Sequence, residues 1–255
     1  MPARPGGPRL SRDVAPGVHR LEHAFVNSYL IVDGDAVTIV DTAFPATWDL
    51  LPRVLAAIGR RPGDVAAVVL THAHFDHLGF ATRIPEEWDV PVWAHPEEDY
   101  IAAHPYRYAH ESPRMLYPFR YPGSIPVIAR MVKAGALVVP GIEDLRPLVP
   151  GTKLDVPGQP EVVFTPGHTF GHCALHLPDR DALLTGDALV TFNPYTAGTG
   201  PQVVSAAATA DLEQAFESLA LLDAVDAGTV LPGHGEPWRS GVRAATVEAR
   251  LAGPS

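Results

Sequence analysis

The chain has 255 residues, of which 46% are hydrophobic and 19% are charged. This length suits one large α/β domain or two small ones, and the composition excludes a disordered or fibrous chain. The net charge of −10 gives no electrostatic reason to expect a nucleic acid or an anionic membrane as a partner. No apolar run approaches the roughly 18 residues of a membrane span, and residues 1–18 lack the apolar core of a secretory signal. We therefore expect a cytoplasmic protein.

The single cysteine, Cys173, limits the metal chemistry that the chain can support. One cysteine can form neither an intramolecular disulfide nor a thiolate cage for zinc. Any metal site must therefore use histidine nitrogen and carboxylate oxygen, and the chain has twelve histidines to supply the nitrogen.

The first half of the chain alternates strand and helix patterns. The sequence Asp-Gly-Asp at 33–35 separates two apolar runs and predicts a β-hairpin. The predicted elements are strands at 26–32 and 36–40, a helix at 48–58, a buried strand at 65–70, a helix at 77–84, a strand at 90–94 and a helix at 96–103. This alternation favours an α/β layered domain.

The segment 105–150 interrupts this alternation with recurring prolines and clustered aromatic residues. We interpret it as an insert over the mouth of a pocket; the alternative is a surface excursion whose aromatic residues only pack on the protein. Beyond it, the predicted elements are strands at 161–164, 174–177 and 182–184, a helix at 211–224 with Thr209 as N-cap, a strand at 229–231 and a helix at 242–251. We expect the whole chain, 1–255, to form a single domain of two structural halves.

The sequence Thr-His-Ala-His-Phe-Asp-His at 71–77 carries three imidazoles and a carboxylate directly after a predicted strand. A lone histidine is usually structural or solvated, but four such groups at this spacing favour a metal site. His72 and His74 can point to one side of the turn, and Asp76 and His77 to a second position. Since zinc usually takes four ligands, each of these half-sites needs further partners.

Three later loops can supply those partners, because each carries a histidine or an aspartate at the end of an apolar run. His168 follows Thr-Pro-Gly, Asp187 follows Thr-Gly, and His234 follows Pro-Gly. Functional sites of α/β sheets gather at the carboxyl ends of strands. Four such strand ends in one chain predict a common metal centre.

Four motifs of the chain also occur together, and in this order, in one known family. They are THAHFDHLG at 71–79, TPGHT at 165–169, TGD at 185–187 and PGHG at 232–235. With them the chain resembles the metallo-β-lactamase-fold superfamily of metal-dependent hydrolases, from about Asn27 to Gly235. The resemblance implies an α/β (α+β) fold, a four-layer αβ/βα sandwich in which helices flank two mixed β-sheets.

The resemblance also implies a ligand set for two metal ions per chain. The first ion would be bound by His72, His74 and His168, the second by Asp76, His77 and His234, and Asp187 would bridge the two. Zinc is the expected metal, with iron or manganese as alternatives. Asp41 matches a carboxylate that orients a ligand in this family; a cap at a strand end is its alternative role.

A bridging aspartate resembles the glyoxalase II, lactonase, phosphodiesterase and ribonuclease Z branches of the superfamily. The short stretch after His234 disfavours classical glyoxalase II, which has a helical C-terminal extension, and the acidic charge disfavours the branch that processes tRNA. We expect a dinuclear zinc hydrolase in which a metal-bridging hydroxide attacks a small ester, lactone or thioester. The alternatives are a phosphodiesterase of the same fold, a mononuclear iron dioxygenase acting on sulfur compounds, and a non-catalytic binding protein.

Two residues are predicted to transfer protons during hydrolysis. Asp76 could accept or relay a proton while it binds metal. Tyr195 is the best local candidate for protonating the leaving group, with a packing role as the alternative. His172 is expected near the site without being a ligand, and Cys173 is expected to fill core volume.

The partner is expected to be a small-molecule substrate, bound by the insert at 105–150 and by the loop at 191–203. Three arginines of the insert could clamp an anionic group or be solvated charges: Arg107, Arg114 and Arg120. The sequence leaves the identity of the substrate and the oligomeric state open, a homodimer included.

Overall fold

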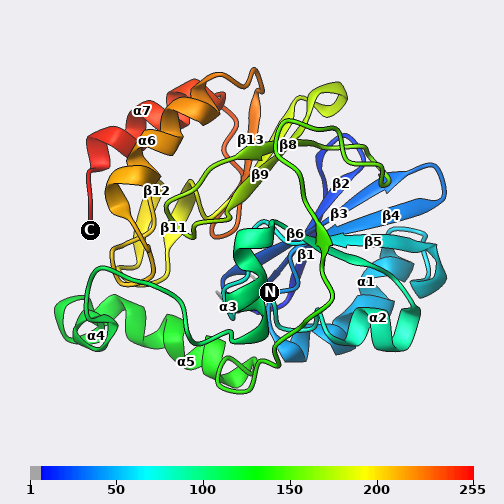
Figure 1. Ribbon diagram of the computed structural model, residues 1–255, viewed down its shortest axis with the longest axis horizontal. Coiled ribbons are helices and arrows are strands. Elements are labelled where there is room, and N and C mark those ends of the chain that lie inside the picture. The colour runs from blue at the N-terminus through cyan, green and yellow to red at the C-terminus, as the bar shows by residue number, and fades with distance from the viewer. Residues whose placement is uncertain (1–6) are drawn as a thin grey trace.

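The computed structural model describes residues 7–255, in which two mixed β-sheets lie face to face (Figure 1). The first sheet contains, in spatial order, β1 (Arg9–Ala15), β2 (Val18–His23), β3 (Val26–Asp33), β4 (Ala36–Val40), β5 (Val65–Val69), β6 (Val92–Ala94) and β7 (Arg146–Pro147). The second contains β13 (Thr229–Pro232), β10 (Ala182–Gly186), β9 (Cys173–Leu177) and β8 (Glu161–Phe164). A two-stranded ribbon adds β11 (Val190–Asn193) and β12 (Gly198–Gln202).

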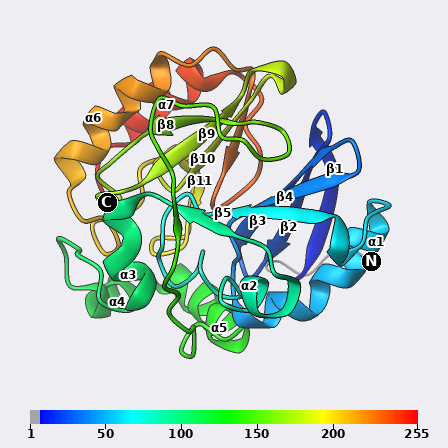
Figure 2. The same ribbon diagram turned by 45° about the vertical axis from the view of Figure 1, so that its right-hand side comes forward.

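Apolar side chains alternate between the two faces of the strands and build separate cores. In β5, Val68 faces the outer helices and Val69 faces the second sheet. In β10, Leu184 faces the first sheet and Leu183 faces outward. The outer helices are α1 (Leu51–Ala57) and α2 (Arg83–Trp88) on the first sheet, and α6 (Leu212–Asp223) and α7 (Val242–Ala252) on the second. Helix, sheet, sheet and helix thus form four layers (Figure 2), which confirms the predicted fold class.

The bounds of several predicted elements agree with the structure to within about two residues. They are the hairpin β3–β4, the buried strands β5 and β8 to β10, strand β13, and helices α6 and α7. The helix expected at 48–58 is divided into a 3-10 turn, Pro45–Leu50, and α1. The helix expected at 96–103 is likewise a 3-10 turn, Pro96–Glu98, followed by α3 (Asp99–Ala103). The buried strands could be predicted from continuous apolar runs because both faces of these strands are buried.

Three predictions about local structure are wrong. Residues 77–82 form turns rather than a helix, and α2 begins only at Arg83, because the backbone of Gly79 packs against that of Ala43. The N-cap of α6 is Asp211, whose side chain accepts a hydrogen bond from the Gln214 amide. Third, no strand was expected before residue 26, yet β1 and β2 lie there; residues 1–6 lie outside the described part of the chain.

The segment 105–150 is only partly an irregular insert. It includes α4 (Tyr117–Arg120) and α5 (Ile125–Lys133), and α5 packs Met131 against the core next to Phe44. Its last part belongs to the first sheet, where β7 pairs in parallel with β6 and Leu148 is fully buried. The irregular insert therefore ends before β7 and not at about residue 150 as expected. Proline hid the strand, because β7 is an edge strand and can accommodate Pro147.

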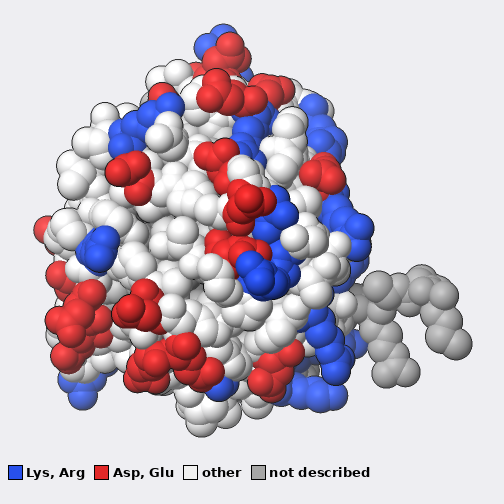
Figure 3. All heavy atoms as spheres, turned by 90° about the vertical axis from the view of Figure 1, so that its right-hand side faces the viewer, with Lys and Arg blue, Asp and Glu red and all other residues white. Residues whose placement is uncertain are grey.

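No helix within residues 7–255 is both long and apolar enough to cross a membrane. On the face shown in Figure 3, basic and acidic side chains lie close to one another along the middle of the surface. That face therefore does not present one continuous surface of a single charge sign.

Candidate metal centre

Seven side chains with metal-ligating atoms converge, buried, at one edge of the two sheets. Each lies in a loop that directly follows a strand: His72, His74, Asp76 and His77 after β5, His168 after β8, Asp187 after β10, and His234 after β13. Their ligand atoms form three groups, each within 4.8 Å: His72, His74 and His168; Asp76, His77 and His234; and His72, His77 and Asp187. The structure thus brings together every residue of the two half-sites expected from the sequence.

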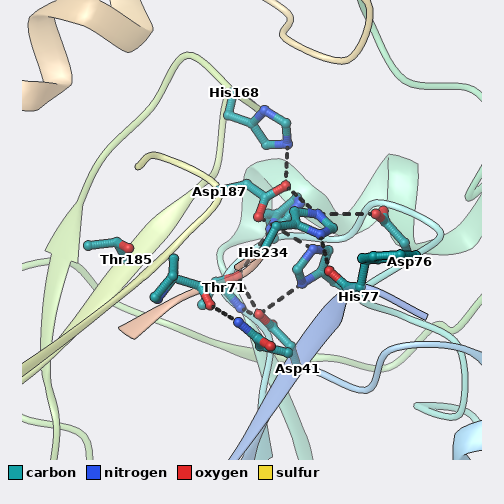
Figure 4. A network of polar contacts seen from close by, with 12 residues as sticks. Asp41, Thr71, Asp76, His77, His168, Thr185, Asp187 and His234 are labelled. Carbon is teal, nitrogen blue, oxygen red and sulfur yellow. Dashed lines mark hydrogen bonds and ion pairs between the residues drawn. The ribbon is translucent and has the colours of Figure 1, made fainter. Parts of the chain in front are cut away.

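Asp187 lies between these groups (Figure 4). Its Oδ2 is 3.5 Å from Nε2 of His168 and 3.1 Å from Nε2 of His234, and its Oδ1 is 3.5 Å from Nε2 of His77. Nε2 of His234 is in turn 3.4 Å from Oδ2 of Asp76. Two ligand atoms about 2.1 Å from one tetrahedral ion are about 3.4 Å apart. These separations suit side chains that share metal ions.

Asp41 orients two of the imidazoles. Its Oδ1 accepts a hydrogen bond from the Thr71 amide at 2.8 Å, and its Oδ2 lies 2.8 Å from the Thr71 hydroxyl and 3.0 Å from Nδ1 of His77. A carboxylate can only accept, so Nδ1 of His77 carries the proton. The Thr71 hydroxyl donates to Asp41 and therefore accepts from Nδ1 of His72, 3.0 Å away. Both rings are left with a free lone pair on Nε2.

Two further imidazoles also donate a hydrogen bond through Nδ1 and leave Nε2 free. Nδ1 of His234 lies 2.8 Å from the carbonyl oxygen of Phe25, which can only accept. Nδ1 of His168 lies 3.3 Å from the hydroxyl of Thr209, which itself donates to the carbonyl of Val204. Thr209 is therefore a supporting residue of the site and not the helix cap expected from the sequence. Such contacts fix the tautomer that leaves Nε2 free for a metal.

The atoms that face the centre have no hydrogen-bond partner among the described residues. These buried atoms are Nε2 of His72, His74, His77, His168 and His234, and Oδ1 of Asp187. Buried polar atoms are nearly always paired in proteins, so six unpaired acceptors at one place require a ligand. Nitrogen and oxygen acceptors in this number fit one or two borderline metal ions.

His172 lies beside this centre and differs from the other imidazoles. Its Nε2 accepts a hydrogen bond from the Asp187 amide at 3.0 Å, and its Nδ1 lies 2.8 Å from the Thr165 hydroxyl. Both ring nitrogens are therefore used. His172 positions Asp187, in agreement with its expected place near the site.

Burial and charge divide the imidazoles into two kinds. Burial holds the pKa values of His72 and His168 well below the ordinary value and lowers the pKa of His74 to about 4, so these rings are neutral and ready to bind metal. Burial also lowers the pKa values of His77 and His234, but Asp187 and the other neighbouring carboxylates together outweigh it and both are raised. Metal binding at His77 and His234 would therefore displace protons.

Glycine at 233 gives Asp187 the space that it occupies. A Cβ atom at Gly233 would lie 2.1 Å from Oδ1 of Asp187 and 2.9 Å from Cε1 of His77. Any larger residue would therefore displace a candidate ligand. The Pro-Gly-His sequence is thus required by close packing as well as by the turn.

A small pocket adjoins the candidate ligands, and Tyr195 forms part of its wall. The pocket has about 10 Å³ of free volume, roughly the space of one water molecule. Tyr108, from the segment 105–150, lines it as well; its hydroxyl lies 3.4 Å from that of Tyr195, and its ring centre 4.1 Å from that of His74. Tyr108 was not predicted, because only tertiary structure distinguishes it from the neighbouring tyrosines.

Glu98 is a second residue that the sequence did not reveal. It is fully buried, and its carboxylate accepts hydrogen bonds from the amide of Ala73 at 2.7 Å and the amide of Gly171 at 2.8 Å. Ala73 lies between two candidate ligands, and Gly171 follows the loop of His168. Glu98 therefore joins the two loops that carry the first half-site.

Comparison with known proteins agrees with this geometry. The family model of the metallo-beta-lactamase superfamily matches residues 22–234. The chain belongs to this superfamily. It is 29% identical over 252 residues to the probable metallo-hydrolase YflN of Bacillus subtilis, covering 88% of this chain and 86% of YflN. The resemblance inferred from the four motifs is therefore confirmed.

Solved structures of the superfamily share the fold. The metallo-beta-lactamase family protein TTHA1429 of Thermus thermophilus aligns over 91% of this chain and 78% of its own, with a TM-score of 0.65 and 27% identity. TTHA1623, solved in a di-iron-bound form, aligns over 87% of this chain and 93% of its own, with a TM-score of 0.61 and 26% identity.

Proposed function

We propose that the protein is a metal-dependent hydrolase that holds two divalent ions and cleaves a small ester, lactone or thioester. The observation that carries this proposal is the set of five Nε2 lone pairs directed, together with Asp187, into one buried centre. The name of YflN as a probable metallo-hydrolase supports the class of activity.

In this proposal His72, His74 and His168 would hold one ion, Asp76, His77 and His234 would hold the other, and Asp187 would contribute to both. Zinc is our first choice because it accepts histidine and carboxylate ligands in tetrahedral sites. Iron and manganese are the alternatives, and the di-iron form of TTHA1623 favours testing iron. Divalent ions so held act as Lewis acids and bring the pKa of water towards neutrality.

Two residues of the pocket are suited to move protons. Burial raises the pKa of Asp76, but the neighbouring His234 and His77 together outweigh burial and lower it, so the carboxylate stays ionised and can accept a proton. Burial and the neighbouring Tyr108 raise the pKa of Tyr195 well above its ordinary value. Its hydroxyl thus keeps its proton and can donate it to a leaving group that enters beside it.

The test combines metal content with a substrate panel. Purified protein should contain about two equivalents of metal per chain, and the zinc-loaded form should hydrolyse one or more of a lactone, an ester and a thioester. Asp187→Ala and His168→Ala should each abolish this turnover. A single bound iron with oxygen uptake on a sulfur substrate, or cleavage of a phosphodiester alone, would instead identify one of the alternative activities.

The role of Tyr195 has its own test. Tyr195→Phe removes the donor and keeps the ring, so kcat should fall for esters with poor leaving groups and stay near normal for esters of acidic phenols, which need no protonation. An equal loss on both kinds of ester would indicate that Tyr195 only packs the pocket.

A further inference from the structure

Arg114 stands next to the pocket of the candidate metal centre. Its Cζ atom lies 4.5 Å from the centre of the Tyr108 ring, which is itself 4.1 Å from the centre of the His74 ring. The guanidinium is therefore within 8.6 Å of the His74 ring, the sum of these two separations. Burial is the main cause that lowers the pKa of His74 to about 4, and the charge of Arg114 acts in the same direction.

The Arg114 side chain has no carboxylate partner. The arginines that form ion pairs within residues 7–255 are Arg9, Arg20, Arg61, Arg83 and Arg250. Arg114 is half-buried and is held by its contact with the Tyr108 ring, an interaction of modest strength. None of its N–H donors is paired with a carboxylate of the described residues, so the guanidinium can bind an anion. Arg107 and Arg120, the other two arginines of this segment, are exposed, as expected of solvated charges.

The position of Arg114 relative to Tyr195 indicates which part of a substrate it would meet. The Tyr108 hydroxyl lies 3.4 Å from that of Tyr195, the residue suited to protonate the leaving group. Arg114 covers the ring of the same Tyr108. Arg114 contacts Tyr108 and Tyr108 contacts Tyr195, so the guanidinium lies one side chain away from the residue proposed to protonate the leaving group.

The segment that carries Tyr108 can admit a leaving group. The pocket as it stands has room for about one water molecule, so a substrate must displace part of its wall. Residues 105–113, which include Tyr108, form neither helix nor strand. The backbone–backbone hydrogen bond of residues 105–110 is the one from the Arg107 amide to the His104 carbonyl, so Tyr108 can shift at low cost when a leaving group enters.

We propose that Arg114 is a specificity-determining residue that binds an anionic group, carboxylate or phosphate, on the leaving group of the substrate. This inference rests on the hydrolase proposed above and names the class of substrate for that same site. A planar guanidinium binds either oxyanion through paired hydrogen bonds. The preferred substrates are therefore esters or thioesters whose leaving group ends in a negative charge.

The test uses three acetate esters of similar shape on the zinc-loaded protein: 4-acetoxybenzoate, its neutral methyl ester, and 4-acetoxyphenyl phosphate. The wild type should favour a charged ester over the neutral one by roughly 10- to 100-fold in kcat/KM, the range expected of a charge-assisted hydrogen bond. Arg114→Gln should bring this ratio close to one, mainly through KM, and leave the neutral ester unchanged. Arg120→Gln, on the same segment, is the matched control and should keep the ratio. Comparison of the two charged esters tells whether the group is carboxylate or phosphate.

A binding measurement separates this inference from the proposed function. Calorimetry with the products 4-hydroxybenzoate and 4-hydroxyphenyl phosphate should show binding that Arg114→Gln weakens by a similar factor, whether or not the esters turn over. Absence of hydrolysis of these esters and of the lactone and thioester tested above, together with Arg114-dependent binding, would reject the hydrolase and keep the anion site. A wild-type ratio near one, an equal loss on all three esters in Arg114→Gln, or product binding that does not depend on Arg114 would overturn the inference.

Discussion

Asp41 shows, at the scale of single residues, how one carboxylate can set the state of a whole site. It fixes His77 directly and His72 through the Thr71 hydroxyl, so that two Nε2 lone pairs face the centre. It adopts the left-handed conformation, with φ of 58°, which aspartate tolerates better than most residues. Its expected role in orienting a ligand is therefore favoured over that of a simple strand cap.

Asp41→Asn tests this role. Asparagine offers one acceptor oxygen where donors now reach both oxygens of Asp41, so its NH2 group faces either the Thr71 amide or the Thr71 hydroxyl and His77. The hydrogen bonds that set the tautomers are disturbed, and metal affinity should fall by roughly 10- to 100-fold. Metal retained after dialysis against a chelator measures the effect. Asp223→Asn is the control, because Asp223 pairs with Arg250 on the outer helices and its loss should leave metal retention unchanged. Equal retention in both variants would contradict the assignment.

Gly233 supports a second prediction at this scale. Gly233→Ala places a methyl group where Oδ1 of Asp187 lies, so Asp187 must move and both metal content and hydrolysis should fall sharply. Gly63→Ala is the matched control: Gly63 has open space around its Cβ position, and neither glycine has a positive φ. Metal titration of the two variants makes the comparison. Normal metal binding by Gly233→Ala would show that the loop can relax.

At the scale of elements, Glu98 connects loops that follow strands of different sheets. It lies between β6 and α3 and accepts from the amides of Ala73 and Gly171. Glutamine has a single acceptor oxygen, so Glu98→Gln leaves one buried amide unpaired and should cost about 1–3 kcal/mol in the free energy of unfolding. Thermal or urea unfolding measures the loss. Glu161→Gln, at an exposed pair with His176, should cost under about 0.5 kcal/mol.

Glu98 should also make the free energy of unfolding depend on pH. Burial raises the pKa of Glu98 to about 7, above the ordinary value of 4.5. The folded chain then keeps a proton that the unfolded chain has lost, so this contribution to stability is full below about pH 4.5 and disappears as the pH rises towards 7. In urea unfolding of the chelated protein across this range, the stability of the wild type relative to Glu98→Gln should fall as the pH rises, because the other titrating groups are common to both. Parallel curves for the two proteins would refute it.

At the scale of the whole molecule, the candidate centre joins the two sheets. The loop after β5 belongs to the first sheet, and the loops after β8, β10 and β13 belong to the second.

A metal ion held by loops of both sheets would bind only the folded chain. It would stabilise the fold by mass action, by about 4 kcal/mol when the free metal concentration is a thousand times Kd. Chelation should therefore lower the melting temperature, and added zinc should restore it. The metal-dependent change in melting temperature should persist in Tyr195→Phe and be mostly lost in Asp187→Ala. A wild-type melting temperature that does not depend on metal would contradict the proposed metal centre.

The sequence by itself determined which strands are buried and which residues end them. Those properties are local: apolar runs reflect burial on both faces, and His72, His168, Asp187 and His234 directly follow such runs. The carboxyl ends of such strands gather at one sheet edge. The position of the candidate ligands directly after the strands was therefore enough to predict that they lie together. The four motifs then sufficed for the family and the fold class.

The tertiary structure decided the features that depend on contacts between distant segments. The edge strand β7 was hidden by proline because its pairing with β6 needs no donor from Pro147. His172 and His168 look alike in the sequence, yet a hydrogen bond from the Asp187 amide occupies Nε2 of one and leaves that of the other free. Glu98 and Tyr108 contact residues that lie far from them in the sequence, such as Gly171 and Tyr195. No local pattern encodes such partners, because burial and hydrogen bonding at these positions arise only when the two sheets and the segment 105–150 close around them.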